Sequence, residues 1–231
     1  FGTSGTCNVN TGSDILEAPG TYPLVLKRIA GETVYCLEGM VVTAGAVFEW
    51  LAHGLGIMNT PADSERLAIS VPDSNGVYVL PALQGIGTPH FNFTRAAEIG
   101  GLTRGASRAH IVRAAMESVS FRVREMVDAV YGATGMRIPG TLRADGGASA
   151  NPVLMQIQAD ALGTPVERMA PLEATGWGAA VLAGIGIGHL KPDAVTTLRS
   201  VDQTFTPQWS EDERELRYAT WRNACGLTGA S

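Results

Sequence analysis

The sequence is poor in charge. Asp, Glu, Lys and Arg make up 17% of its 231 residues, against about 25% in a typical soluble domain. A disordered chain combines high charge with low hydrophobicity, whereas 45% of these residues are hydrophobic. The 17 Lys and Arg are outnumbered by 22 Asp and Glu, which gives a net charge of −5. The composition therefore argues against a disordered chain. Because basic residues are not in excess, it also predicts that the protein has no nucleic-acid partner.

Cysteine and long apolar runs are also scarce. The 3 cysteines are far apart and form no Cys-x-x-Cys pair, which argues against a disulfide scaffold or a zinc site and fits a reducing cytoplasm. The longest apolar stretch, 179–187, is interrupted by glycine and is too short to span a bilayer, so no membrane partner is expected. Because the chain begins with Phe1 and not with Met, we interpret it as a fragment of a longer protein.

The order of the predicted elements indicates a mixed α/β fold. Two β-rich runs, 22–30 and 33–37, flank Gly31-Glu32 and predict a hairpin. An apolar face predicts a helix over 43–55, and a second apolar face predicts a long helix over 108–131, with Ser107 as its N-cap and Gly132 as its stop. The remaining predicted elements are strands at 7–10, 77–80, 142–144 and 166–168 and helices at 152–162, 175–188 and 211–225. Early strands followed by a β-α-β-α alternation predict a mixed sheet with helices on both faces.

Glycine is abundant, at 28 of 231 residues, and it is dispersed along the chain. Three glycine turns could bind a ligand: 2–6, 43–46 and 145–151. In 2–6 and 145–151, exposed backbone amides could hold an anion. Taken alone, each turn is also compatible with an ordinary tight connection between elements. In 145–151 the turn follows a strand and precedes a helix that begins with Asn151 as N-cap and Pro152, so its amides are expected to point outward.

Several well-known catalytic motifs are missing. The sequence has no Walker A motif, no strict Gly-x-Gly-x-x-Gly after a strand and no nucleophile elbow. The histidines show no metal-ligand spacing. From the residues alone, the sequence thus indicates an α/β domain with several glycine turns that could hold phosphate.

Six ordered segments together resemble the FGGY carbohydrate kinases, and within that family the glycerol kinases. Asp145-Gly146-Gly147 with Asn151 resembles the family's Asp-Gly-Gly-x-x-x-Asn, and the run 101–105 matches its Gly-Leu-Thr-Arg-Gly. The other matching segments are 2–12, 37–50, 77–90 and 175–184. Any one match would be weak, whereas six in order at suitable spacing are specific.

This resemblance implies an actin-like ATPase fold of the ribonuclease H-like type. It also implies that residues 1–231 form the C-terminal, nucleotide-binding domain of a two-domain kinase whose N-terminal domain is not in this chain. ATP and Mg²⁺ would be the cofactors, with the metal held mainly through the nucleotide. The catalytic Asp is expected upstream of Phe1, so the resemblance assigns no catalytic or metal-binding residue within the chain. Its implied nucleotide contacts are Thr3, Gly45, Glu49, Gly147 and Asn151.

Some residues depart from the family pattern. Thr6 replaces a Phe that packs against the polyol, Glu49 replaces a Gln, and the loop 92–96 is altered. The implied reaction is transfer of the γ-phosphate of MgATP to a terminal hydroxyl of glycerol or a similar small polyol. A pentulose kinase similar to xylulokinase and a non-catalytic actin-like ATP-binding module remain alternatives. The expected partners are the polyol, ATP, the protein's own N-terminal domain and a possible second copy.

Overall fold

The computed structural model describes residues 1–136 and 140–227. Its first sheet is antiparallel and contains β1 (Gly5–Gly12), β2 (Tyr22–Ile29) and β3 (Glu32–Val41), in the order β1-β3-β2. Ile29 pairs with Glu32 across the turn between β2 and β3, which confirms the predicted hairpin. The third strand extends beyond the predicted 33–37, because it pairs with β2 on one side and β1 on the other.

Short elements connect this sheet to the central helix. The predicted helix 43–55 is present as α1 (Ala46–Glu49) followed by a π-helical turn (Trp50–Gly54), in which the amide of Leu55 donates to the carbonyl of Trp50. A π-helical turn is rare and frequently marks a functional site. Next along the chain are α2 (Asp63–Ile69) and the antiparallel pair β4 (Tyr78–Leu80) and β5 (Glu98–Gly100).

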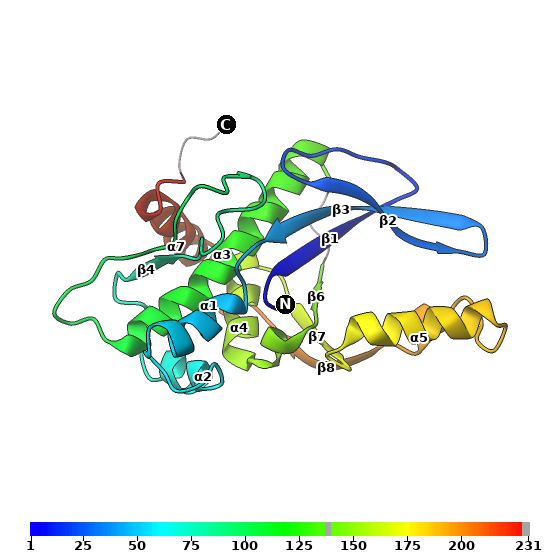
Figure 1. The fold of residues 1–231 in the computed structure, drawn as a ribbon. Coiled ribbons are helices and arrows are strands. Elements are labelled where there is room, and N and C mark those ends of the chain that lie inside the picture. Colours follow the sequence, from blue (N-terminus) through cyan, green and yellow to red (C-terminus); the bar gives the residue numbers. More distant parts are fainter. Residues whose placement is uncertain (137–139, 228–231) are drawn as a thin grey trace.

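The long helix α3 (Arg108–Thr134) crosses the centre of the molecule (Figure 1). Ser107 and His110 form a capping box at its start, as the position of Ser107 predicted. The predicted stop at Gly132 is wrong: the helix continues to Thr134 and ends at Gly135, which has a left-handed φ of 66°. Tyr131 and Met136, on either side of the last turn, pack against a buried cluster that includes Leu37, and the Thr134 hydroxyl donates to the Val130 carbonyl at 2.8 Å. These contacts hold the last turn and outweigh the cost of one glycine inside a helix.

The second half of the chain forms the mixed sheet. Strand β6 (Leu142–Ala144) is parallel to β7 (Val166–Ala170), and β7 is antiparallel to β8 (Ser200–Phe205). The remaining elements are a 3₁₀ turn (Gly147–Ala150), α4 (Pro152–Leu162), α5 (Ala174–Gly186), α6 (Ala194–Thr197) and α7 (Glu211–Ala224). The predicted α/β class is confirmed, and the strands are divided among three sheets.

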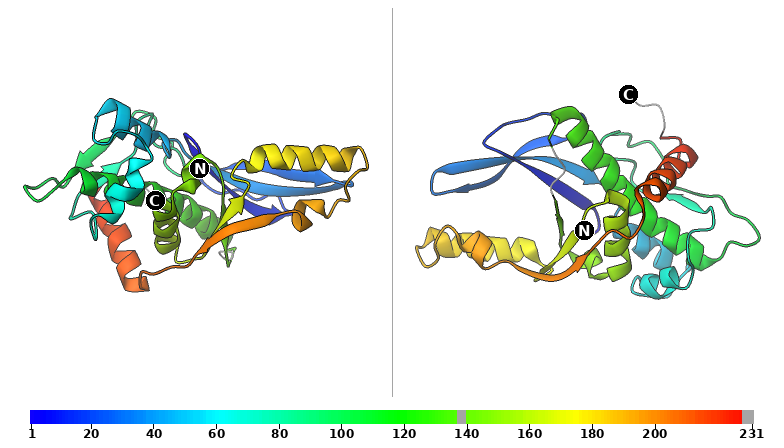
Figure 2. Two further views of the ribbon diagram at one scale, coloured as in Figure 1. Left: turned by 90° about the horizontal axis from the view of Figure 1, so that it is seen from below. Right: turned by 180° about the vertical axis from the view of Figure 1, so that it is seen from behind.

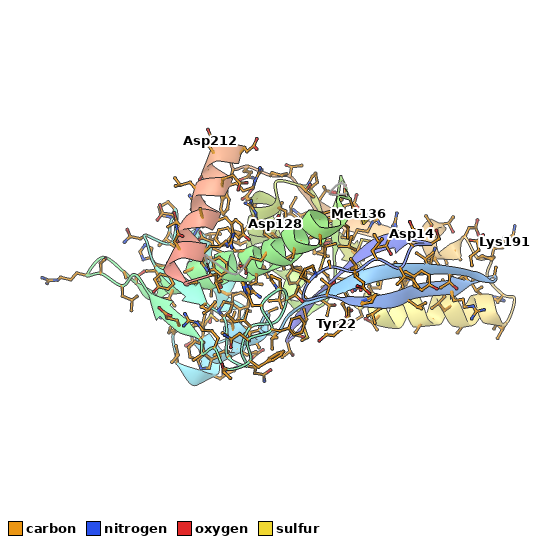
Figure 3. All side chains as sticks on the ribbon, turned by 90° about the horizontal axis from the view of Figure 1, so that it is seen from above. Asp14, Tyr22, Asp128, Met136, Lys191 and Asp212 are labelled. Atoms are coloured by element: carbon orange, nitrogen blue, oxygen red, sulfur yellow. The ribbon has the colours of Figure 1, made fainter. Side chains whose placement is uncertain are left out.

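Helix α5 and the β2–β3 hairpin project from the same end of the molecule (Figure 2). Seen from above, Tyr22 marks the start of β2, and Lys191 follows α5 at the outer end (Figure 3). Although α5 is rich in apolar residues, Val181 is its one buried residue, and Ile187 directly after it is 82% exposed. Most apolar side chains of α5 are therefore not covered by other parts of the described chain, and we call this the uncovered apolar face of α5. Within the described residues, no helix combines the length and apolarity needed to cross a membrane.

A slot separates the first sheet from the mixed sheet. We call it the inter-sheet slot; its volume is about 610 Å³, and residues 5–10 of β1 and 141–145 around β6 line its two sides. Both strands lie at the edges of their sheets, so each turns an edge toward this slot. Tyr131 of α3 also lines it. Burial raises the pKa of the Cys7 thiol to about 11 and that of Tyr131 to about 12, so both are neutral at pH 7.

A buried ion network connects α3 to the loop that follows β4 and to α7. Arg122 donates hydrogen bonds to the Glu125 carboxylate and, at 2.6 Å, to the Thr88 carbonyl. His90 Nε2 lies 3.1 Å from Glu125 Oε1, and Arg222 Nε lies 3.7 Å from the same atom. Burial lowers the pKa of Arg122, and the neighbouring Glu125 carboxylate opposes this effect. The charge of Arg122 is therefore tolerated in the interior because Glu125 is beside it.

Glu125→Ala is expected to lower the free energy of unfolding by about 3–5 kcal/mol, because it leaves the buried Arg122 without its ionic partner. Urea denaturation followed by circular dichroism measures the loss. The matched control is Glu215→Ala, which removes a half-exposed carboxylate paired with Arg124 at 2.6 Å, and for such a pair a loss of about 0–1 kcal/mol is expected. Equal losses for the two variants would contradict this account of the network.

Candidate functional site

One cavity brings together the residues that the sequence resemblance selected. We call it the glycine cavity; its volume is about 490 Å³. Thr3, Gly45, Glu49, Gly147 and Asn151 all line it, although they come from three separate segments of the chain. The structure therefore places all five predicted nucleotide contacts around a single space.

The first wall is the junction between the N-terminal segment and α1. The amide of Gly45 donates to the Gly2 carbonyl at 2.9 Å, and the amides of Ala44 and Ala46 both donate to the Thr3 carbonyl. A Cβ atom on Gly45 would lie 2.5 Å from the Gly2 oxygen. Glycine is therefore required at position 45 by the close approach of the chain itself, whereas the sequence suggested the approach of a ligand.

The opposite wall is the turn 145–151, and here the structure corrects an expectation. The sequence predicts that the amides of this turn point outward toward an anion, but four of them donate to carbonyls inside the protein. The acceptors are Leu172 O for Gly146 (2.8 Å), Phe1 O for Ala148 (3.0 Å), Gly146 O for Ser149 (3.0 Å) and Ala148 O for Asn151 (3.2 Å). Distant parts of the chain supply two of these acceptors, so the local pattern could not reveal them.

Gly147 differs from its neighbour Gly146. A Cβ on Gly146 would lie 2.5 Å from the Phe1 carbonyl oxygen, whereas a Cβ on Gly147 would meet no atom within 4 Å. Gly146 has a left-handed φ of 85°, and Gly147 lies outside that region. The backbone of Gly147 therefore borders the open space of the cavity directly. A side chain at this position would fill part of the cavity and would not strain the turn.

Asn151 joins this wall to two helices. Its Oδ1 accepts hydrogen bonds from the amides of Val153 (3.0 Å) and Leu154 (3.2 Å), which confirms the predicted N-cap of α4. Its Nδ2 donates to Ser64 Oγ of α2 at 3.1 Å. Since a side-chain amide carries two N–H donors, one remains for a ligand.

Sequence reasoning missed the contribution of α2. Pro61, Ala62, Ser64 and Glu65 line the glycine cavity beside α1. The sequence did carry a signal for this helix start, because residues 60–63 read Thr-Pro-Ala-Asp, a Ser/Thr-x-x-Asp/Glu pattern typical of a helix start. In the structure the Asp63 carboxylate accepts from the amides of Asn59 (3.2 Å) and Thr60 (3.1 Å). A hydrogen bond from Arg66 lowers the pKa of Asp63 below its usual value, which keeps this carboxylate ionised.

The charged side chains that line the glycine cavity are both acidic. They are Glu49 at the end of α1 and Glu65 of α2, and none of the described residues that line the cavity is Lys or Arg. Glu49 Oε2 lies 3.3 Å from His53 Nε2, one helical turn later, and these side chains are 63% and 65% exposed. Within residues 1–136 and 140–227, no group of three or more His, Cys, Asp or Glu side chains is arranged to hold a metal ion.

Thr6 lies apart from these residues. It belongs to β1 and lines the inter-sheet slot together with Arg143 and Asp145 of the opposite side, whereas the glycine cavity does not include it. The structure therefore separates the position that the resemblance linked to the substrate from the five that it linked to the nucleotide.

Curated relatives match nearly the whole chain. A glycerol kinase of Citrifermentans bemidjiense is 41% identical over 229 residues, and the match covers 99% of this chain and 46% of the relative. A glycerol kinase of Alkalilimnicola ehrlichii is 42% identical over 234 residues, and the match covers 96% of this chain and 46% of the relative. The chain thus spans about half the length of the curated relatives it matches.

Solved structures and a family model agree with these matches. A crystal structure of Plasmodium falciparum glycerol kinase with ADP superimposes with a TM-score of 0.90 at 28% identity, and the match covers 100% of this chain and 46% of that chain. A crystal structure of a xylulose kinase from Rhodospirillum rubrum superimposes with a TM-score of 0.78 at 26% identity. This match covers 98% of this chain and 45% of that chain. The model for the C-terminal domain of the FGGY family of carbohydrate kinases matches residues 1–187. Together with the confirmed α/β architecture, these matches show that the chain belongs to the FGGY family of carbohydrate kinases.

Proposed function

We propose that this chain is the nucleotide-binding half of a glycerol kinase-like enzyme. The enzyme transfers the γ-phosphate of MgATP to a terminal hydroxyl of glycerol or a similar small polyol. The observation that carries the proposal is the gathering of Thr3, Gly45, Glu49, Gly147 and Asn151 around the glycine cavity. The volume of this cavity, about 490 Å³, lies within the usual range of small-molecule sites.

The residues of the cavity suit a nucleotide in distinct ways. The open space beside Gly147 admits a flat ring close to the backbone. The exposed Thr3 side chain offers a hydroxyl, and Asn151 retains one N–H donor. ATP supplies the phosphoryl group that is transferred. Mg²⁺ fits a site in which the phosphates and water provide most of the ligands, as phosphotransferases commonly use it.

We further propose that a second domain completes the enzyme. The inter-sheet slot and the uncovered apolar face of α5 are surfaces that a partner domain can bury. The chain also spans less than half the length of its curated relatives. That domain supplies the catalytic Asp, the general base for the polyol hydroxyl. The enzyme acts in the cytoplasm.

Gly147→Val is expected to abolish nucleotide binding while the fold remains intact. The valine side chain would fill the open space beside the backbone, and φ at this position is not left-handed. Thr3→Ala removes one hydroxyl contact, worth roughly 0.5–1.5 kcal/mol, so it should weaken binding only modestly. Calorimetric titration of MgADP into both full-length variants measures the ranking, and circular dichroism checks folding. If a folded Gly147→Val protein bound MgADP as tightly as wild type, the glycine cavity would not be the nucleotide site.

Thr6→Phe tests the substrate. A phenyl ring covers more of the apolar face of glycerol than a threonine methyl, and burial is worth about 25 cal/mol per Å². If glycerol is the substrate, the variant should have a lower KM for glycerol. The control is the KM for ATP, which should not change because Thr6 lies outside the glycine cavity. An unchanged or higher KM for glycerol, together with good activity on a pentulose, would favour the xylulokinase-like alternative.

A further inference from the structure

The peptide group between Ala150 and Asn151 belongs to one wall of the glycine cavity, and both residues line that cavity. The amide of Asn151 donates to the Ala148 carbonyl at 3.2 Å. The carbonyl of Ala150 accepts a hydrogen bond from Arg168 Nη1 at 3.1 Å. Both polar atoms of this peptide group therefore have a partner, and the second partner comes from another element, strand β7.

The neighbouring strand β8 holds the Arg168 side chain in turn. Arg168 Nε donates to Asp202 Oδ2 at 2.6 Å, and Nη2 donates to Gln203 Oε1 at 3.1 Å. The guanidinium carbon lies 5.6 Å from the centre of the Phe205 ring, and the side chain is only 15% exposed. Because a guanidinium is planar and its N–H groups point in fixed directions, these contacts also fix the direction in which Nη1 points.

The turn 147–150 is thus held from two sides. The Phe1 carbonyl accepts from the amide of Ala148, and Arg168 connects Ala150 to the mixed sheet. Hydrogen bonds within a 3₁₀ turn have poor geometry, so contacts from outside contribute strongly to the position of so short a segment. Gly147 begins this turn and Asn151 follows it directly. The position of Asn151 relative to Gly147 therefore depends on Arg168.

On the basis of the proposed function, we propose that Arg168 is a positioning residue for the nucleotide site, and that Asp202 orients it. Neither residue is among the described residues that line the glycine cavity, so neither is proposed to touch the nucleotide. Arg168 acts by holding the Ala150 carbonyl, which keeps the two proposed contacts of this wall, Gly147 and Asn151, ordered before the nucleotide binds. A site that is already ordered does not lose affinity to the cost of ordering it.

The test measures the affinity for MgADP by calorimetric titration into the full-length protein, at a temperature at which circular dichroism shows each variant to be folded. Arg168→Ala should weaken binding by about tenfold, the size expected when one hydrogen bond from a charged group is lost. Arg168→Lys keeps the charge but has one nitrogen in place of three, so it should restore little of the affinity. Full recovery in Arg168→Lys would overturn the proposal, because charge alone would then account for the effect.

Arg124 provides a matched control for loss of stability. Its side chain is 11% exposed and lies 2.6 Å from the half-exposed Glu215 carboxylate, as Arg168 lies 2.6 Å from the half-exposed Asp202. It also lies over an aromatic ring, that of Tyr218, at 4.1 Å. Arg124→Ala should lower the melting temperature about as much as Arg168→Ala, but it should leave the affinity for MgADP unchanged. Equal weakening of binding in the two variants would reduce Arg168 to a structural role and overturn the proposal.

Asp202→Ala tests the same connection without removing the arginine. Its carboxylate is 48% exposed, so the variant is expected to fold even if Arg168→Ala does not. It should weaken MgADP binding several-fold in the wild-type protein and have no further effect in Arg168→Ala, because it acts through Arg168. Additive effects in the double variant, or wild-type affinity in Asp202→Ala, would contradict the proposed role of Asp202.

These outcomes separate the inference from the proposed function. If wild type binds MgADP and a folded Arg168→Ala protein binds it equally well, the positioning role is wrong while the nucleotide site stands. If wild type does not bind MgADP, the nucleotide site itself is wrong, and the role of Arg168 is excluded with it.

Discussion

The carbonyl groups of Phe1, Gly2 and Thr3 hold both walls of the glycine cavity in place. Gly2 and Thr3 accept hydrogen bonds from the start of α1, and Phe1 accepts from Ala148 in the opposite wall. Three consecutive residues thereby fix the width of the cavity. The two glycines with close approaches, Gly45 and Gly146, are needed because these carbonyls lie where a Cβ would be.

Beneath the cavity, α3 provides the scaffold. It packs against α4, which begins at the cavity with Asn151, and against α2, which supplies another part of the lining. The buried pair of Arg122 and Glu125 attaches the same helix to the loop after β4. The cavity thus rests on elements whose positions are set by one buried helix.

The glycine cavity, the inter-sheet slot and the apolar face of α5 differ in how far other parts of the chain enclose them. The glycine cavity is lined by the described chain alone, while the inter-sheet slot has two strand edges turned toward it and α5 leaves an apolar face uncovered. This division agrees with a half-enzyme in which the nucleotide site is intrinsic to the domain. In the proposed enzyme the polyol site is completed by the other domain, and Thr6 lines the slot that we propose this domain covers.

The sequence by itself determined the features that depend on neighbouring residues. Examples are the hairpin at Gly31, the N-cap of α3 at Ser107 and the N-cap of α4 at Asn151, because caps and tight turns are local. The resemblance also selected five of the residues that line the cavity. The tertiary structure alone decided the end of α3 at Gly135, the inward direction of the amides around Gly146 and the contribution of α2. These features depend on burial and on hydrogen bonds between residues far apart in the chain, and a local sequence pattern contains no information about such partners.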